Sequence, residues 1–294
     1  MNKHTSLGSR IFDGCNIIVL LLLIFATVYP IYYIFIVSIS DGNLVTRGLI
    51  KFYPMDITFD AYKVVFDNPK IWQAYGNTLI YTIVGTLINV VMTALCAFPL
   101  SRKDFYGRNI FIFMVAVTMF ISGGLIPVYL VVQQLGLIDT MWALMLPTAI
   151  STFNMIIMKT YFEGIPVALQ ESAYLDGANE LQVLWKIILP LSLPVMATMV
   201  LFYAVHHWNS FFPALIYLND SEKFPVQVLL RNIVIAGEFA DQTADIGSAS
   251  SNFRVVATNY KFAVIIITIL PILIAYPYLQ KYFVKGAMIG ALKG

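Results

Sequence analysis

Charged residues are scarce in this chain. Only 12% of its 294 residues are Asp, Glu, Lys or Arg, whereas 59% are hydrophobic. A soluble domain carries about 25% charged residues, and the mean hydropathy here is +0.79. The composition therefore excludes an ordinary soluble domain. It predicts an integral membrane protein, and its long apolar runs predict that it is all-α.

Cysteine is almost absent as well. The two cysteines, Cys15 and Cys96, lie at or inside apolar runs, which excludes a disulfide framework. Cys15 precedes its apolar run, which is the wrong order for a lipoprotein signal, and no small-residue cleavage site follows that run. We therefore expect the first apolar run to stay in the protein as a membrane span. The net charge of +2 gives no indication of a nucleic-acid partner.

The chain has no glycine-rich phosphate loop with its lysine, so we expect it to bind no ATP and no other cofactor. His206 and His207 are the only obvious metal or acid–base candidates, and adjacent helical residues point about 100° apart. We expect no metal site and no catalytic residue. A secondary transporter would carry more ionisable residues within its spans. An intramembrane enzyme or a receptor would need paired catalytic groups or a signalling domain, and neither is found.

Six apolar runs are long enough to cross a membrane, which takes about 20 residues. The predicted spans are 17–39, 74–100, 109–134, 141–161, 191–218 and 260–282. Gly123-Gly124 and Pro127 predict a bend or a break in the third span. The expected organisation is an N-terminal segment 1–14, a first transmembrane helix 15–40, an external loop 41–72, a transmembrane core 73–284 and a tail 285–294.

Basic residues decide the orientation. An even number of spans places both termini on one side, and the segments on that side hold ten Lys and Arg against six Asp and Glu. The opposite side holds eight against ten. Arg102, Lys103 and Arg108 cluster in one short loop on the first side. Because short cytoplasmic loops are enriched in Lys and Arg, the termini are predicted to be cytoplasmic.

The polar insert 164–190 between two apolar runs is predicted to be cytoplasmic too. Pro166 suits the first turn of a helix over 167–174, because its missing N–H costs nothing there. Asp176-Gly177 is a turn signal. A second amphipathic helix should end at Leu189-Pro190, because a residue before proline is disfavoured in the α region. That helix is predicted by the spacing of Leu181, Leu184, Trp185 and Ile188. An ordinary loop between spans is the alternative.

This insert resembles the EAA loop of importer-type ABC permeases. The family pattern is E-A-A, three residues, G, nine residues, then I-x-L-P, and the chain matches that spacing with Ser172 in place of one alanine. The resemblance implies a type I ABC importer permease fold in which the insert forms cytoplasmic coupling helices that dock in a cleft of the ATPase. The implied coupling residues are Glu171, Ser172, Ala173, Asp176, Gly177, Ala178, Leu189 and Pro190.

Other segments look like the carbohydrate-uptake branch of these permeases. They are Asn77-Thr78-Leu79, Pro99–Phe105, Ile126–Leu130, Leu135–Thr140, Trp208-Asn209 and Gln280–Gly286. The last is similar to the maltose-transporter permease of the G type, and the matches run from about 74 to 294. Within the branch the chain looks closest to permeases paired with a lipoprotein receptor for complex oligosaccharides.

The resemblance also implies partners. They are a second homologous permease, two cytoplasmic ATPase subunits that use ATP and Mg, an extracellular solute-binding lipoprotein, an oligosaccharide substrate and the lipid of a bacterial cytoplasmic membrane. A peptide or a polyamine is the alternative substrate within the importer class. A secondary transporter is the alternative from another class, and ATP dependence of uptake would distinguish it.

Polar groups within a bilayer usually face the bundle interior or a water-filled cavity. The candidate pathway residues are therefore Asn77, Asn154, Tyr203, His207, Trp208 and Asn209. An interfacial aromatic belt is the alternative for Tyr203 and Trp208, and a helix cap is the alternative for Asn77. The polar loop 219–259 corresponds to a scoop that enters the binding protein in maltose-type relatives, or is a plain external loop. The tail 285–294 either lies between the ATPases or frays.

Overall fold

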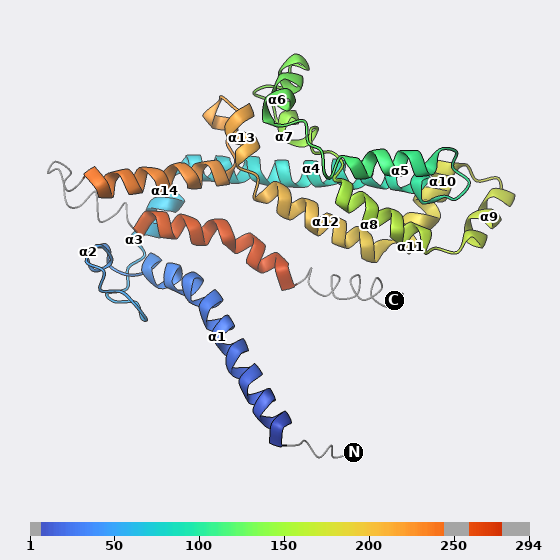
Figure 1. The fold of residues 1–294 in the computed structure, drawn as a ribbon. Coiled ribbons are helices and arrows are strands. Elements are labelled where there is room, and N and C mark those ends of the chain that lie inside the picture. The colour runs from blue at the N-terminus through green and yellow to red at the C-terminus, as the bar shows by residue number, and fades with distance from the viewer. Residues whose placement is uncertain (1–6, 244–258, 278–294) are drawn as a thin grey trace. The chain divides into compact units, whose positions relative to one another are not determined.

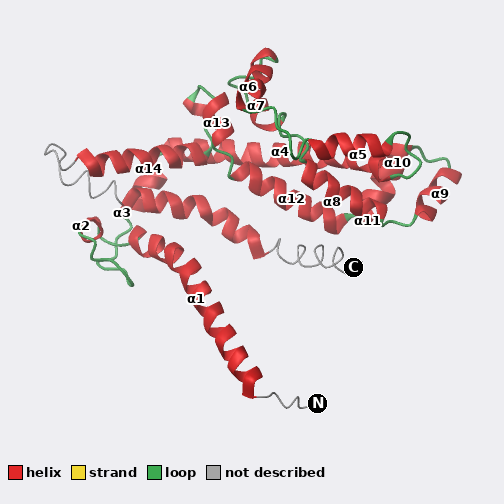
Figure 2. Ribbon diagram, viewed as in Figure 1, coloured by secondary structure: helices red, strands yellow, loops and turns green. Residues whose placement is uncertain are grey.

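The computed structural model describes residues 7–243 and 259–277, and every regular element in those two ranges is a helix (Figures 1 and 2). The fold class predicted from composition is confirmed at this level. Contacts divide the chain into two units. One is built from the described parts of Met1–Asn68 and Leu230–Ile269, the other from those of Pro69–Leu229 and Leu270–Gly294.

The first unit contains one long apolar helix, α1 (Leu7–Ser38), whose side chains are mostly exposed. Two short helices follow, α2 (Gly42–Thr46) and α3 (Asp60–Asp67). Asp41 caps α2 by accepting a hydrogen bond from the backbone N–H of Asn43 at 2.9 Å. A small core forms where the end of α1 packs on this segment, built from Ile36, Val37 and Ile50.

The second unit is organised around α4 (Pro69–Ser101), a helix of 33 residues. Two helices that come much later in the chain, α8 (Thr152–Glu163) and α12 (Leu193–Trp208), pack along it (Figure 1). Their shared core is apolar, so burial of these side chains holds the three helices together. It includes Ala94, Ala97 and Phe98 of α4, Met155, Met158 and Phe162 of α8, and Val195 and Met199 of α12.

Three helices in the described ranges are long and apolar enough to cross a membrane: Ile11–Ser38, Pro69–Ser101 and Asn259–Pro277. They coincide with the first, second and sixth predicted spans. Two predicted boundaries differ from the structure, because Leu7–Gly14 already belong to α1 and α4 begins at Pro69 rather than 73 or 74. The predicted residues 278–282 and the tail 285–294 lie outside the described ranges.

The other predicted spans are interrupted helices. The third consists of α5 (Arg108–Val117) and α6 (Leu125–Gln134), separated by the glycine-containing segment where a break was predicted. The fourth was predicted to be continuous, and this is wrong. It is divided into α7 (Trp142–Met145) and α8, because Pro147 lacks the N–H that would continue α7. The fifth stops at Trp208, and α13 (Phe212–Tyr217) begins anew around Pro213.

The polar segment predicted as an external loop over 219–259 contains regular structure. A 3₁₀ turn, η2 (Ser221–Lys223), and the 18-residue helix α14 (Val226–Thr243) occupy its first part, and residues 244–258 lie outside the described ranges. The backbone N–H of Val226 donates to Thr78 Oγ1 at 2.8 Å, so the start of α14 is held against α4.

Candidate functional site

The polar insert forms a compact knob at the C-terminal end of α4 (Figure 1). We use "the knob" for residues 166–191. Its first helix, α9 (Val167–Leu175), follows Pro166 as predicted, and Gly177 turns the chain with φ +82°. Its second helix starts at α10 (Glu180–Val183), where Asn179 and Gln182 form a reciprocal capping box. Sequence reasoning missed this cap, although an Asn followed three residues later by Gln is a known signal for a helix start.

The predicted end of the second helix is wrong. The chain continues from α10 through a π-helical turn (Leu184–Ile188) and α11 (Leu189–Leu191), and Leu189 keeps helical angles of φ −64° and ψ −43°. The wider π turn rearranges the carbonyls that the Pro190 ring would otherwise meet in a regular helix. The sharp bend, 87°, comes two residues later, between α11 and α12.

The motif residues divide into a buried set and an exposed set. Ala173 and Leu189 are buried in the core shared with α4, and Ala178 packs against it. Glu171, Ser172, Asp176, Gly177 and Pro190 are exposed. The helix also presents exposed apolar side chains, with Val167 60% and Leu175 90% accessible. The knob therefore sits on the bundle by its small residues and turns a mixed acidic and apolar surface outward.

A polar cluster joins the knob to the residue that follows α4. Arg102 donates to both carboxylate oxygens of Asp104, at 3.1 and 2.9 Å, and to Glu180 Oε2 at 2.6 Å. It also bonds to the Tyr174 hydroxyl. Its hydrogen bond to Asp104 raises the pKa of Arg102 and lowers the pKa of that carboxyl, so both stay charged. Sequence reasoning used Arg102 as a positive charge and as part of the segment Pro99–Phe105, and it did not predict the contact with the knob.

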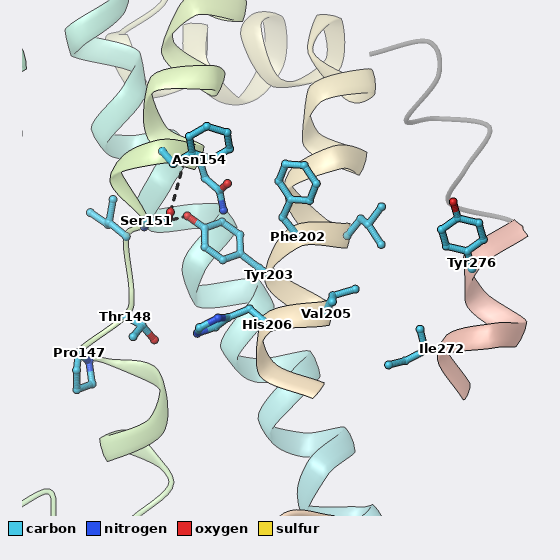
Figure 3. A pocket seen from close by; sticks show the side chains of 13 residues that line it. Pro147, Thr148, Ser151, Asn154, Phe202, Tyr203, Val205, His206, Ile272 and Tyr276 are labelled. Carbon is cyan, nitrogen blue, oxygen red and sulfur yellow. Dashed lines mark hydrogen bonds between the residues drawn. The ribbon is translucent and has the colours of Figure 1, made fainter. Parts of the chain in front are cut away.

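A cavity of about 860 Å³ lies in the second unit, between the α7–α8 connection and α12 (Figure 3). One wall carries the Asn154 amide and the Tyr203 ring, and Ile272 and Tyr276 lie across from them. The Asn154 side chain makes no hydrogen bond within the described part of the chain, although the residue is only 6% exposed. The remaining lining residues are Pro147, Thr148, Ile150, Ser151, Phe153, Leu201, Phe202, Val205 and His206.

The break between α7 and α8 is stabilised by side chains of other helices. Thr93 and Tyr203 share a hydrogen bond of 2.6 Å between their hydroxyls, and Tyr203 also accepts one from the backbone N–H of Ser151 at 3.1 Å. Asn89, fully buried on α4, donates to the Thr148 carbonyl at 2.5 Å. Backbone groups released by a break need such partners where water is scarce. The cavity wall is thus a supported, non-helical segment.

The structure places the six candidate pathway residues in different surroundings. Of the six, only Asn154 and Tyr203 line the cavity. His206 also lines it, whereas the candidate His207 does not. His207 is buried against Asn89, and Trp208 packs its ring edge-on against Tyr75. Asn209 ends α12 and is exposed.

Asn77 is not a helix cap, because α4 begins eight residues earlier. Its amide instead donates to the carbonyls of Glu222 and Phe224, at 2.6 and 3.2 Å.

A second polar cluster, also missed from sequence, joins the segment after α6 to η2. Asp139 accepts hydrogen bonds from the backbone N–H groups of Asn219 and Asp220, at 3.0 and 3.1 Å. Lys223 Nζ lies 2.7 Å from Asp139 Oδ2, and these bonds lower the pKa of Asp139 to about 2. Asp139 has φ +60°, a conformation in which Asp is enriched. Its place in an L-G-L-I-D-T turn was the available signal.

Metal ligands do not cluster in this structure: within residues 7–243 and 259–277, no three His, Cys, Asp or Glu side chains are placed to hold an ion. The cavity offers one free amide, hydroxyl groups and several rings. The knob offers a shaped surface for another macromolecule.

A family model and two relatives match this chain over nearly its whole length. A sequence model of the family described as "Binding-protein-dependent transport system inner membrane component" matches residues 2–288. Protein LplC of Bacillus subtilis is 44% identical over 291 residues, which cover 99% of this chain and 98% of that protein. The polygalacturonan/rhamnogalacturonan transport system permease protein YtcP of the same organism is 42% identical over 97% of this chain and 99% of its own.

A solved structure is similar as well. It is a chain from the crystal structure of a bacterial ABC transporter involved in the import of the acidic polysaccharide alginate, with a TM-score of 0.87 and 35% identity. The similarity covers 96% of this chain and 100% of that one.

Proposed function

Because this chain belongs to the family of binding-protein-dependent transport system inner-membrane components, we propose that it forms one half of the pathway by which a bacterial importer takes up oligosaccharides. The chain is a multi-pass membrane permease subunit of an ABC importer, and ATP hydrolysis belongs to separate subunits. The substrate, the partners and the orientation that follow are parts of the proposal.

The cavity carries the substrate assignment. A sugar has an apolar face that stacks on aromatic rings and hydroxyls that bond to amides. The Asn154 amide, beside the Tyr203 ring and opposite Tyr276, provides both kinds of contact. The names of YtcP and of the alginate transporter support a carbohydrate rather than a peptide or a polyamine. The lining residues described here include no Lys or Arg, so any acidic group of the sugar would be recognised elsewhere.

Six spans are proposed, with α5–α6, α7–α8 and α12–α13 as interrupted spans between the continuous ones. Asn77 contacts residues 222–224 and Arg102 contacts the knob, and these residues are 25 positions apart on or just beyond α4. At 1.5 Å per residue the separation is about 37 Å, which exceeds the hydrocarbon thickness of about 30 Å. This supports opposite membrane sides for the knob and residues 222–224. The excess of Lys and Arg in the segments on the side of the knob supports a cytoplasmic knob and cytoplasmic termini, with residues 219–259 outside.

The proposed mechanism uses the exposed surface of α9. Two ATPase subunits that close on ATP and Mg would displace Glu171–Gly177, and the bundle would rock from inward-facing to outward-facing. An extracellular lipoprotein would then deliver the sugar to this chain and to a second homologous permease. Six spans enclose only one side of such a pathway, so a second permease is required.

The first test is purification of the tagged chain from mild detergent with identification of its companions. Recovery of a second permease, an ATPase and a sugar-binding lipoprotein supports the assembly. Reconstituted vesicles should then take up pectin- or alginate-derived oligosaccharides only with ATP, and neutral oligosaccharides serve as the comparison. Uptake without ATP, by the chain alone, would overturn the proposal and favour a secondary transporter.

The cavity itself is tested by Asn154→Leu, which has a similar volume and no amide. The expected result is a rise in the KM for sugar of about tenfold or more, since an unpaired sugar hydroxyl in a buried site is costly. Asn109→Leu, at an exposed position on α5, is the control. An unchanged KM in Asn154→Leu would remove the cavity from the pathway.

A further inference from the structure

The knob is connected by the chain to only two helices of the bundle. α8 leads into it and α12 leads out of it, whereas α4, the central helix of the second unit, is distant in sequence. Apolar contacts seat the knob on the end of α4, through residues such as Ala173 and Ile188. The hydrophobic effect behind such contacts is non-directional, whereas hydrogen bonds to a fixed side chain also define an orientation. A directional link between the knob and α4 would make the two move together more rigidly.

Arg102 supplies a link of that kind. It directly follows α4, and its backbone N–H still bonds to the Pro99 carbonyl at 3.2 Å, so its base is fixed by the helix. Its guanidinium reaches α9 at Tyr174 and α10 at Glu180. Tyr174 in turn donates to Glu180 Oε2 at 2.7 Å. Both arms of the knob are therefore tied to one side chain, on either side of the Gly177 turn.

The geometry of the guanidinium makes this a rigid connection. Asp104 accepts two parallel bonds from Nε and Nη2, which orients the plane and directs Nη1 to the knob. The plane also lies over the Tyr174 ring, with 5.2 Å from Cζ to the ring centroid. A planar fork with several fixed donors holds orientation in a way that an ammonium group does not. The Arg102 side chain is 20% exposed and that of Glu180 is 62% exposed, so solvent screens the charge of this pair, and the connection depends on the fixed geometry of the guanidinium.

A second arginine makes a similar connection to a different helix. Arg108 bonds through Nε to the Leu100 carbonyl at 2.9 Å and pairs with Glu163 at the end of α8. It joins α4 to α8 and does not touch the knob. The basic loop after α4 thus has two separate roles, and only Arg102 serves the knob.

We propose that Arg102 is a positioning residue for energy coupling: it fixes both arms of the knob to α4, so that a push on α9 moves α4 directly. This rests on the proposed function of the knob as the surface that the ATPase displaces. Without the link, a push on α9 would reach α4 only through the apolar contacts of the knob and through α8 and α12, and the angle between α9 and α10 could change at Gly177.

The test uses the complete transporter in vesicles, with sugar transported per ATP hydrolysed as the readout. Arg102→Gln and Glu180→Gln should each lower this ratio about tenfold, within the range of usual coupling energies, while ATP hydrolysis continues. The double variant should lose no more than one single variant, because both remove the same link. Lys103→Gln removes one positive charge from the same loop, and Lys103 makes no ion pair among the described residues, so it should keep the ratio.

A normal ratio in an assembled Arg102→Gln transporter would overturn the inference, and so would an equal loss in Lys103→Gln. If Arg102→Gln does not assemble, Tyr174→Phe removes a single hydroxyl and should still lower the ratio at least threefold; an unchanged ratio there also overturns it. Failure of the unaltered protein to couple uptake to ATP would refute the proposed function instead, so the two failures are distinguishable.

Discussion

His207 and Asn89 form a buried hydrogen bond between α12 and α4, with 2.6 Å between Nε2 and Oδ1. Asn89 donates its own N–H to the Thr148 carbonyl, so its Oδ1 is the acceptor and His207 Nε2 carries a proton. The two side chains thus hold an unwound segment in the middle of the bundle. This one amide links α4 to α12 through His207 and to the connection between α7 and α8 through the Thr148 carbonyl.

Replacing Asn89 should therefore destabilise the bundle more than its size suggests. Asn89→Leu leaves the Thr148 carbonyl and His207 Nε2 buried without their partner, which should lower the free energy of unfolding by about 1–3 kcal/mol. The thermal midpoint in detergent would show it. His206→Leu, at the exposed neighbouring position, should leave the midpoint nearly unchanged. Equal midpoints for Asn89→Leu and the unaltered protein would contradict the role given to this amide.

Gly85 leaves the space that the His207 ring occupies. A Cβ at this position would lie 2.5 Å from His207 Nε2 and 2.6 Å from Cε1. The ring is held by Asn89 and cannot move away freely, so Gly85→Ala should cost about 1–3 kcal/mol of stability. Gly76→Ala is the matched control on α4, because nothing lies within 4 Å of a Cβ there, and it should be neutral or stabilising. Adding His207→Ala should recover much of the loss, and failure to do so would place the strain elsewhere.

Gly177 is required for a different reason. Its φ is +82° and the space around a Cβ is empty, so a substitution there strains the backbone without a clash. Gly177→Val should cost about 1–2 kcal/mol in this conformation, whereas Asn and Asp tolerate it better. We expect Gly177→Val, and to a lesser degree Gly177→Asp, to uncouple ATP hydrolysis from transport while the complex still assembles. Normal sugar transport per ATP in both variants would argue against the knob as a lever.

The Asp139–Lys223 pair predicts a pH dependence at the other end of α4. Hydrogen bonds from Lys223 and from two backbone N–H groups lower the pKa of Asp139 to about 2, against about 3.9 for an unperturbed aspartate. A lowered carboxyl pKa stabilises the fold above the unfolded value, and that contribution disappears as the pH falls through the folded value.

The thermal midpoint of the unaltered protein should therefore fall between about pH 4 and pH 2 by more than that of Asp139→Asn. The asparagine keeps an oxygen for the two backbone groups but loses the ion pair with Lys223. Parallel curves for the two proteins over this interval would contradict the assignment.

Much of the fold could be predicted from local signals. Apolar length identified α1, α4 and the helix at 259–277, and Pro166 and Gly177 correctly bounded α9. Local rules failed at Pro147 and Pro190, in opposite directions. Pro147 breaks a span that hydropathy had predicted to be continuous. Pro190 lies inside a helix that was predicted to end there, because the residue before a proline is disfavoured in the α region. Hydropathy does not predict the break between α7 and α8, because the backbone groups of that break form hydrogen bonds with side chains distant in sequence.

The sequence by itself determined that this is a helical membrane protein with a two-helix insert, because hydropathy, charge and glycine conformation act over a few residues. Its resemblance to the EAA loop is what indicated a permease. Only the tertiary structure decided which polar residues meet. Asn154 and Tyr203 share a cavity, His207 turns away to Asn89, and Arg102 holds the knob. Each pairing joins residues tens of positions apart. Their proximity depends on how α4, α8 and α12 pack, and no local pattern specifies that packing.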